Sequence, residues 1–173
     1  MIDARLDRVG IVMMSAVGDA VHVLPVINAI KRRQADAHIT WVLQPGPATL
    51  VRGHRSVDEI VIFDRSRGRR AFIDVKRELS QRPFDLVLNL QVYFKAGLVT
   101  SFTRAPVKLG FDKPRARDLN WLFTTHRIPS FPVGQHVQDQ YFEFLTALGI
   151  PYEPVVWDHG PTEAERAWQR AFF

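Results

Sequence analysis

The first residues able to do chemistry follow a short apolar segment near the N-terminus. After Val9 to Met14 comes the turn Ser15-Ala16-Val17-Gly18-Asp19, and His22 lies one helical turn beyond Asp19. A carboxylate just past the end of a strand is placed where open α/β sheets bind ligands. On position alone, Asp19 also suits a helix N-cap, which would satisfy free backbone N–H groups.

The same turn offers a glycine and its backbone. We expect Gly18 to supply a positive φ angle or a close backbone approach, and the N–H groups of Ser15 to Gly18 could hold an anion. His22 either hydrogen-bonds a substrate, orients Asp19, or is a satisfied interior histidine. The sequence has no G-x-G-x-x-G fingerprint, no P-loop, no cysteine and no H-E-x-x-H pair, so it indicates neither a nucleotide signature, a thiol nucleophile nor a metal site.

Basic residues gather in two stretches of a chain whose formal net charge is +5. The first stretch holds Arg65, Arg67, Arg69, Arg70, Lys76, Arg77 and Arg82. The second holds Arg104, Lys108, Lys113, Arg115 and Arg117. Such clusters favour anionic partners, and the alternative is a solvated helix face. Because no nucleic-acid reader motif is present, we expect no nucleic-acid partner.

Apolar segments alternate with helical patterns along the first two thirds of the chain. Strands are expected at 9–14, 39–43, 59–63, 84–90 and 107–111. Helices are expected at 19–34, from a turn at 45–47 to about residue 52, at 69–81 and at 94–103. Pro25 should bend the first helix or mark a restart. The alternation predicts an α/β fold, a Rossmann-like parallel sheet with helices on both faces.

The last third follows a different pattern. Residues 112–133 hold three prolines and are expected to be largely loop, and a helix from about His136 to Leu148 should end at Gly149. We therefore place one domain at residues 1–150 and interpret 151–173 as a linker with the start of a further helix. Four aromatic residues are expected in the core rather than as sugar-stacking platforms: Tyr141, Phe142, Phe144 and Trp157.

The N-terminus does not resemble a signal peptide, because Asp3, Arg5, Asp7 and Arg8 interrupt any apolar run. The longest apolar stretches are too short to span a bilayer. We expect a soluble protein of the reducing cytoplasm. The basic stretch at 65–82 is expected to bring it into peripheral contact with the anionic inner face of the cytoplasmic membrane.

Four ordered segments resemble glycosyltransferase family 9, the heptosyltransferases. Val12 to Pro25 resembles the family's opening strand, Ser-x-x-Gly-Asp turn and Leu-Pro step. Ala37 to Leu43 is similar to its second strand with a Trp-Val pair, and His54 to Ile60 resembles its "hPxVDEV" segment. Phe84 to Gln91 resembles its "YDxVIDLQG" strand. The matches run in the right order from about residue 8 to about residue 148.

Two positions depart from the family pattern. The sequence has Met13 where the family often has Lys or Arg. It also has Asn89-Leu90-Gln91-Val92 where the family usually has Asp-x-Gln-Gly.

The resemblance implies one half of a GT-B fold, in which two Rossmann-like domains face each other. This chain would supply the N-terminal, acceptor-side domain of an enzyme whose donor-binding C-terminal domain is absent here. The implied reaction is inverting transfer of heptose from a nucleotide sugar, ADP-heptose, to a lipopolysaccharide inner-core acceptor, with no metal or other cofactor. The partners would be that nucleotide sugar and a lipid-linked anionic saccharide. The alternative is a non-catalytic Rossmann-like module that binds a phosphorylated ligand.

The resemblance also assigns roles to residues. Asp19 matches the family's proposed base, which would remove the proton of the acceptor hydroxyl. Ser15, Gly18, His22 and Gln91 lie in the matching motifs and are expected to bind substrate.

Three further positions match basic or histidine positions of the family. Lys95 follows the fourth strand, and its alternative is a plain surface lysine. Arg117, favoured over Arg115, lies in a loop that carries acceptor-binding cations. The alternative there is a salt bridge to Asp112 or Asp118. His136 matches a histidine near the start of the late helix.

Overall fold

One parallel sheet forms the centre of the molecule in a computed structural model that describes residues 1–130, 134–158 and 163–172. Its six strands lie in the order β3-β2-β1-β4-β5-β6 and every neighbouring pair is parallel. The strands are β1 Arg8–Val12, β2 His38–Leu43, β3 Glu59–Ile62, β4 Leu86–Asn89, β5 Val107–Gly110 and β6 His126–Arg127. This is the strand order of the Rossmann fold, so the predicted fold class is confirmed.

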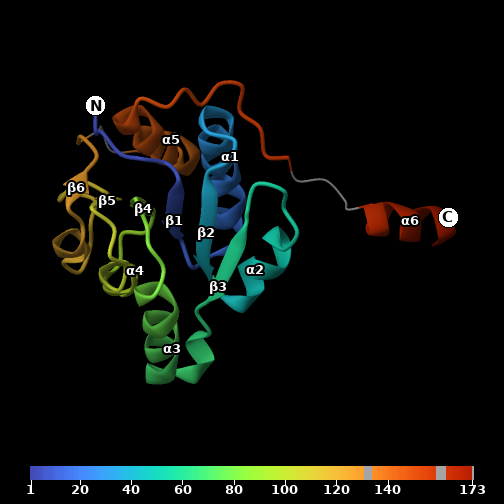
Figure 1. The fold of residues 1–173 in the computed structure, drawn as a ribbon, viewed down its shortest axis with the longest axis horizontal. Helices are drawn as coiled ribbons and strands as arrows, with labels where there is room; N and C mark the ends of the chain where they lie inside the picture. The colour runs from blue at the N-terminus through green and yellow to red at the C-terminus, as the bar shows by residue number, and fades with distance from the viewer. Residues whose placement is uncertain (131–133, 159–162, 173) are drawn as a thin grey trace.

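Helices cover both faces of the sheet (Figure 1). On one face lie α1 Val17–Arg33, α2 Pro45–Val51 and α5 Val137–Leu148, and on the other lie α3 Arg69–Ser80 and α4 Phe94–Ser101. Side chains of β1 and the residues after it alternate between the two cores: Ile11 and Met13 pack on the α1 side, and Val12 and Met14 on the α3 side. Both faces are therefore buried, as the continuous apolar strands predicted.

Two expectations about proline, a restart of the helix at Pro25 and a separate turn at 45–47, were wrong. α1 does not restart at Pro25 but continues through it as a single 17-residue helix. Residues 45–47 are not a separate turn but the first turn of α2, with Pro45 at its start. Proline is tolerated there because the first N–H groups of a helix have no partner inside the helix.

The stretch 112–133 is less irregular than expected. It contains a 3-10 helix, Asn120–Phe123, and the edge strand β6, which continues the sheet next to β5. The Thr125 hydroxyl accepts a hydrogen bond from the backbone N–H of Lys108 at 2.8 Å and so starts this pairing. A strand of two exposed polar residues carries no periodicity that sequence analysis could detect.

The segment after α5 is packed on the domain as far as residue 158. Backbone oxygens of Tyr152, Val156 and Trp157 accept hydrogen bonds from Arg32, Asn28 and His54, at 2.9, 2.7 and 3.0 Å. The rings of Phe142 and Tyr152 stack with their centres 4.4 Å apart. We call residues 151–158 the strap, because this part of the expected linker crosses α1 in a fixed path (Figure 1).

The last helix, α6 Glu163–Phe172, stands apart from the rest in Figure 1. Its Trp168 and Phe172 rings stack on each other, 5.2 Å between centres, and are 62% and 68% exposed. Within the described part of the chain, they do not enter either core. None of the helices described is long and apolar enough to cross a bilayer.

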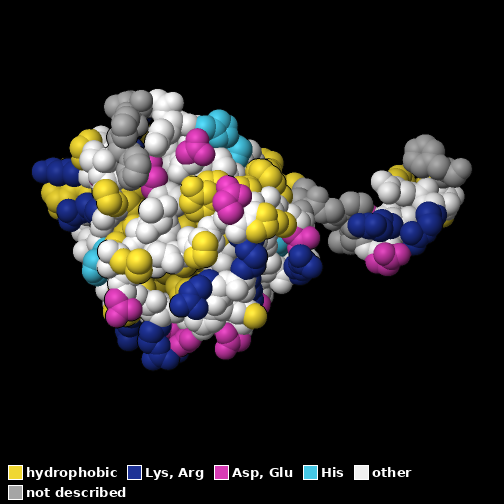
Figure 2. All heavy atoms as spheres, turned by 90° about the horizontal axis from the view of Figure 1, so that it is seen from above, with side chains coloured by type: hydrophobic (Ala, Val, Ile, Leu, Met, Phe, Trp, Pro, Cys, Tyr) yellow, Lys and Arg dark blue, Asp and Glu magenta, His cyan; other side chains and the backbone are white. Residues whose placement is uncertain are grey.

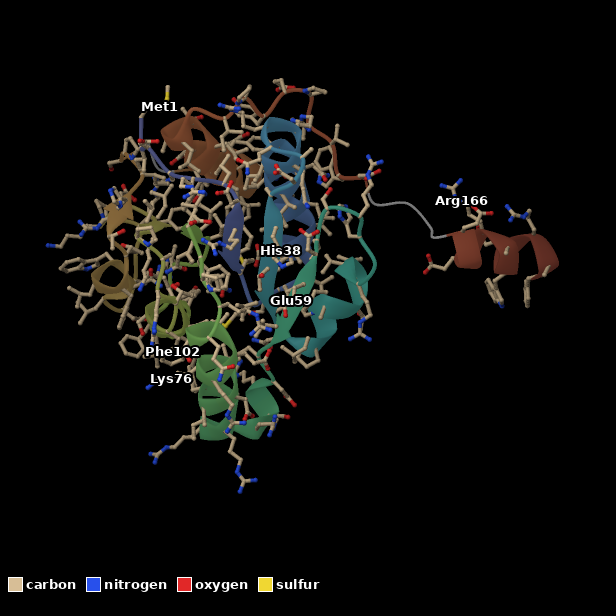
Figure 3. The ribbon with its side chains drawn as sticks, in the orientation of Figure 1. Met1, His38, Glu59, Lys76, Phe102 and Arg166 are labelled. Carbon is tan, nitrogen blue, oxygen red and sulfur yellow. The ribbon has the colours of Figure 1, made fainter. Side chains whose placement is uncertain are left out.

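Charged pairs link neighbouring strands at the end of the sheet where the strands begin. Arg8, at the start of β1, donates from Nε and a terminal nitrogen to the two carboxylate oxygens of Asp85, at 3.0 and 3.1 Å. His38 at the start of β2 lies 4.0 Å from Glu59 of β3 (Figure 3). The hydrogen bond from Arg8 lowers the pKa of Asp85 below its usual value.

The Arg8–Asp85 pair should make the free energy of unfolding depend on pH. Because the pKa of Asp85 is lowered in the folded state, its stabilisation is present above the ordinary pKa of 3.8 and is lost as pH falls through the folded-state pKa. We expect Arg8→Gln to lower the free energy of unfolding only modestly at neutral pH, because Arg8 is half exposed and its charge is screened by solvent. At strongly acidic pH the variant and the wild type should have nearly the same free energy of unfolding.

Urea denaturation at neutral and acidic pH measures this difference. Arg52→Gln is the matched control, since Arg52 is exposed and takes part in none of the ion pairs among the described residues. An Arg8→Gln loss of equal size at both pH values would contradict the linkage.

Candidate active site

The order of the strands reverses between β1 and β4, and the loops that leave these strands meet at the carboxyl edge of the sheet. Gln91, in the loop after β4, joins them. Its Oε1 accepts from the backbone N–H of Met14 at 3.1 Å, and its Nε2 donates to the backbone oxygen of Ser15 at 2.6 Å. Gln91 was predicted to bind substrate, and the structure uses its side-chain amide to fix the loop that precedes α1.

Asp19 lies at the third position of α1, and the N-cap is Ala16. The interpretation of Asp19 as the N-cap itself is therefore wrong. Its Oδ2 accepts a hydrogen bond from the backbone N–H of Ala16 at 2.8 Å, which is its one hydrogen bond among the described residues. The positive end of the helix dipole favours a carboxylate here. One carboxylate oxygen is thus held by the backbone while the other is left for a ligand.

Gly18 does not have the positive φ angle that was one of its two expected roles. It is helical, and the glycines with positive φ are elsewhere, at 53, 68, 134 and 149. A Cβ atom added at Gly18 would meet nothing within 4 Å. The space beside it in the first turn of α1 is therefore open, and the fold itself does not require a glycine there.

Two predicted cations follow the neighbouring strands β4 and β5 at this edge. Lys95 is exposed at the second position of α4. Arg117 is exposed in the loop after β5, its backbone N–H donates to the oxygen of Val92 at 2.7 Å, and its guanidinium lies 5.9 Å from the centre of the Tyr93 ring. The structure thus brings the loops after β1, β4 and β5 together, as predicted for a ligand site at this edge.

Two residues that sequence analysis missed hold these loops. Asn120 donates to the backbone oxygen of Tyr93 at 2.6 Å and accepts from the side chain of Asn89 at 3.0 Å. Asn89 is fully buried in β4. A buried side-chain amide requires a hydrogen-bond partner. A polar residue in a predicted buried strand therefore indicated that Asn89 has a partner, but not which residue it is.

Arg115 and Arg117 have distinct surroundings. Arg115 is largely buried between Asp112 and Glu143, with nitrogen–oxygen distances of 2.6 and 2.7 Å. The salt-bridge alternative therefore applies to Arg115, whose pair with Glu143 ties the loop after β5 to α5. Arg117 remains exposed, in agreement with the preference for Arg117 as the ligand-binding cation.

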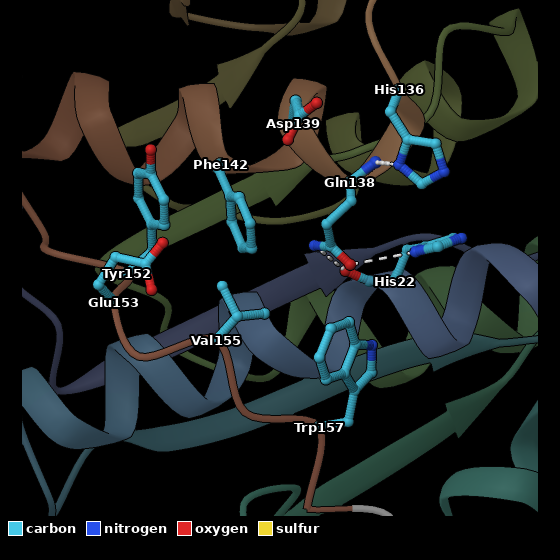
Figure 4. Close-up of a pocket in the computed structure, with 9 residues that line it drawn as sticks. All are labelled: His22, His136, Gln138, Asp139, Phe142, Tyr152, Glu153, Val155 and Trp157. Carbon is cyan, nitrogen blue, oxygen red and sulfur yellow. Dashed lines mark hydrogen bonds between the residues drawn. The ribbon is translucent and has the colours of Figure 1, made fainter.

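His22 and His136 lie together, beside α5 (Figure 4). The Nδ1 atom of His22 is 3.0 Å from Oε1 of Gln138, and Asp19 is not its partner. His136 is the N-cap of α5 and accepts the backbone N–H of Gln138 at 3.2 Å. The two imidazole rings meet edge to face, 5.3 Å between centres. Gln138, which sequence analysis did not single out, therefore connects both histidines.

The aromatic predictions have mixed outcomes. Tyr141, Phe142 and Phe144 are 4%, 6% and 0% exposed, which confirms them as core residues. Trp157 is 39% exposed, so its assignment to the core was wrong. Burial, with a smaller effect from the charge of Asp19, raises the pKa of Tyr141, so its phenol stays protonated beside the site.

This arrangement defines a Rossmann-like domain with a carboxylate, an open helix start and two exposed cations at its strand-order reversal. The sequence profile of "Glycosyltransferase family 9 (heptosyltransferase)" matches residues 72–173, more than half of the chain. The chain therefore belongs to glycosyltransferase family 9, which confirms the resemblance.

Relatives and solved structures agree with this assignment. The chain is 28% identical over 148 residues to the lipopolysaccharide core heptosyltransferase OpsX of Haemophilus influenzae, covering 86% of this chain and 42% of that protein. It is 26% identical to lipopolysaccharide heptosyltransferase 1 of Pseudomonas aeruginosa, covering 88% and 46%. The Escherichia coli heptosyltransferase WaaC with ADP-2-deoxy-2-fluoro heptose superposes with a TM-score of 0.76 at 25% identity, covering 88% and 52%. The chain thus spans about half the length of these relatives.

Replacement of Gln91 by leucine should release the loop that carries Ser15. The change removes both side-chain hydrogen bonds and leaves the N–H of Met14 and the oxygen of Ser15 without these partners, so we expect a loss of about 1–3 kcal/mol in unfolding free energy. Amide exchange of residues 14–17 should accelerate. Urea denaturation and hydrogen exchange measure the two effects.

Gln81→Leu is the matched control, because Gln81 is exposed at the end of α3 and should change stability by less than about 0.5 kcal/mol. If Gln91→Leu behaved like Gln81→Leu, the loop would not depend on this side chain.

Proposed function

We propose that this chain is the acceptor-side domain of an inverting glycosyltransferase. The complete enzyme would transfer heptose from ADP-heptose to a lipopolysaccharide inner-core acceptor. The position of Asp19 carries the proposal: a carboxylate in the first turn of α1, at the strand-order reversal, in a chain of glycosyltransferase family 9. The two lipopolysaccharide heptosyltransferases that the chain resembles support this choice of acceptor, and the ADP-2-deoxy-2-fluoro heptose in the WaaC structure supports the choice of donor.

In this mechanism Asp19 is the general base. The acceptor hydroxyl gives its proton to the Asp19 carboxylate while its oxygen forms a bond to the anomeric carbon. The bond from that carbon to the diphosphate breaks on the opposite face of the sugar, and ADP leaves with the electron pair. The Ala16 N–H holds one carboxylate oxygen, and the open side of Gly18 gives the acceptor room to approach the other. The proposed step requires no metal or other cofactor.

The anionic groups of a lipid-linked saccharide would bind at Lys95 and Arg117. Both cations are exposed, Lys95 in the first turn of α4 and Arg117 in the loop after β5. The Tyr93 ring beneath Arg117 restricts where its guanidinium can lie, which favours bidentate contact with a phosphate or carboxylate. The nucleotide sugar would be bound mainly by a second domain, since the chain matches only about half of each relative.

Replacement of Asp19 by asparagine tests the base assignment. Asparagine keeps the shape and can still accept the Ala16 N–H, but it cannot take up the acceptor proton. In the complete enzyme we expect turnover to fall about 10²–10⁴-fold with little change in the unfolding temperature.

Asp36→Asn provides the control, since Asp36 is an exposed carboxylate in the turn between α1 and β2 and should leave turnover unchanged. Wild-type turnover by the Asp19→Asn enzyme would refute the role of Asp19.

Peripheral contact with an anionic membrane is a second part of the proposal, and α3 carries it. Arg67, Arg77 and Arg82 are paired with carboxylates, so part of the basic stretch is a solvated, neutralised face. Other cations on this face, including Arg70 and Lys76, form no ion pair among the described residues. Lys76 lies 6.0 Å from the centre of the Phe102 ring (Figure 3), and Ile73 is 57% exposed between these cations. A cationic helix with an exposed apolar side chain suits an anionic leaflet, on the cytoplasmic side as we propose.

The double variant Arg70→Gln/Lys76→Gln should weaken binding to vesicles that contain phosphatidylglycerol. Each cation near an anionic surface contributes about 1 kcal/mol, so the pair should lower the partition coefficient by about 30-fold. Vesicle co-sedimentation at low salt measures this.

Arg33→Gln/Arg52→Gln removes the same charge from the end of α1 and from the residue after α2 and serves as the control. Equal loss in both double variants would show that net charge, and not the α3 face, is responsible. Binding that ignores the phosphatidylglycerol content would count against membrane contact altogether.

A further inference from the structure

A hollow of about 420 Å³ lies between α1, α5 and the strap. We propose that it binds an uncharged saccharide unit of about the size of one pyranose ring. This inference does not depend on the proposed transfer reaction or on Asp19. The volume of the hollow falls in the range of about 300–1,000 Å³ that is typical of small-molecule sites. Its lining includes His22, His136, Gln138, Phe142, Val155 and Trp157 (Figure 4).

The hydrogen bonds around Gln138 decide what the two histidines offer to a ligand. Its side-chain NH₂ donates to the backbone oxygen of His22 at 2.9 Å, so its Oε1 is the atom that faces Nδ1 of His22. Nδ1 of His22 therefore carries the proton and its Nε2 is an acceptor. His136 accepts the Gln138 N–H at Nδ1, so its Nε2 is a donor. An acceptor and a donor nitrogen on adjacent rings can bind one hydroxyl group, which both donates and accepts.

Aromatic side chains form the other side of the hollow. Trp157 is 39% exposed, and in Figure 4 its ring points toward Val155 and Phe142 across the hollow. The apolar C–H face of a pyranose ring packs on such a surface while its rim of hydroxyls reaches polar groups.

Hydrogen bonds and ring stacking within the chain fix the position of the strap before any ligand binds. Asn28 and His54 hold the backbone oxygens of Val156 and Trp157, and Tyr152 stacks on Phe142. Asn28 is buried, and its Oδ1 accepts a hydrogen bond from the Ser56 hydroxyl at 2.7 Å. Both the oxygen and the nitrogen of its side-chain amide are therefore hydrogen-bonded within the fold. A preformed site loses less entropy on binding than one that must be ordered.

The charges of the hollow select against an anionic ligand. Its ionisable residues other than the histidines and Tyr152 are Asp139 and Glu153, both exposed carboxylates. Carboxylates accept hydrogen bonds from hydroxyls and repel phosphate. Figure 2, which views the face over α5 and the strap, shows acidic, basic and hydrophobic side chains there. The two carboxylates that line the hollow contrast with Lys95 and Arg117, so the two sites should take different parts of a ligand, or different ligands.

Calorimetric titration of the full chain tests the proposal, with methyl α-mannopyranoside and methyl α-glucopyranoside as uncharged probes and mannose 6-phosphate as the charged one. We expect a dissociation constant of about 1–10 mM for at least one uncharged probe. The phosphorylated probe should bind at least about tenfold more weakly. Trp157→Leu should weaken the uncharged probe about tenfold or more by removing the stacking surface.

Trp168→Leu is the matched control, because it removes an exposed tryptophan from α6 and should leave binding unchanged. Asp139→Asn/Glu153→Gln, which alters charge and not shape, should reduce the preference for the uncharged probe. Asp19→Asn should bind saccharide like the wild type even where it abolishes transfer, so failure of one proposal does not imply failure of the other.

Three results would overturn the inference. The first is no saturable binding of either uncharged probe at about 100 mM. The second is tighter binding of mannose 6-phosphate than of the uncharged sugars. The third is equal weakening by Trp157→Leu and Trp168→Leu, since binding would then not be located at the strap.

Discussion

The reversal of strand order between β1 and β4 is the constraint on which the site depends. Because α1 crosses one face of the sheet and α4 the other, the loops after these strands diverge and leave backbone groups at the edge without ladder partners. The Gln91 side chain supplies those partners to Met14 and Ser15. Together with the hydrogen bonds that Trp41 and Gln44 donate to the oxygens of Met13 and Met14, this side-chain amide fixes the segment that leads into the first turn of α1 and Asp19.

Side-chain hydrogen bonds and one salt bridge also hold the other loops at the carboxyl edge of the sheet. Buried Asn89 reaches Asn120, Asn120 reaches the backbone of Tyr93, and Arg115 links the loop after β5 to Glu143 of α5. Each of these polar groups costs free energy if it is left unpaired, so these contacts hold the loops to one another. Lys95 in the first turn of α4 and Arg117 in the loop after β5 therefore present their charges from backbone that is tied to its neighbours.

Patterns local in sequence predicted most of the fold. The buried strands were visible as apolar runs, and α1, α3 and α5 as helical periodicity, since each signal lies within one element. The turn before Asp19 was likewise found as a motif. The failures involve partners far apart in the chain: Gln138 with His22 is separated by 116 residues, and Trp157 with His54 by 103. Trp157 looked like a core residue because its hydrophobicity is local information, whereas its exposure depends on where the strap crosses α1. The positive φ expected at Gly18 was wrong for another reason, because a glycine in a helix looks the same in sequence as one with positive φ.

α1 is the element that both surfaces share. Asp19 and His22 are three residues apart, so they lie about 4.5 Å apart along the axis and on related sides of its first turns. Both face α5: the charge of Asp19 contributes to the raised pKa of Tyr141, and Nδ1 of His22 lies 3.0 Å from Oε1 of Gln138. One short stretch of helix thus borders both the proposed catalytic carboxylate and the proposed saccharide site. A saccharide that reached from the hollow to Lys95 and Arg117 would carry uncharged hydroxyls at one end and its charge at the other. The orientation of such a saccharide would then follow from where α1, α4 and the loop after β5 place these side chains.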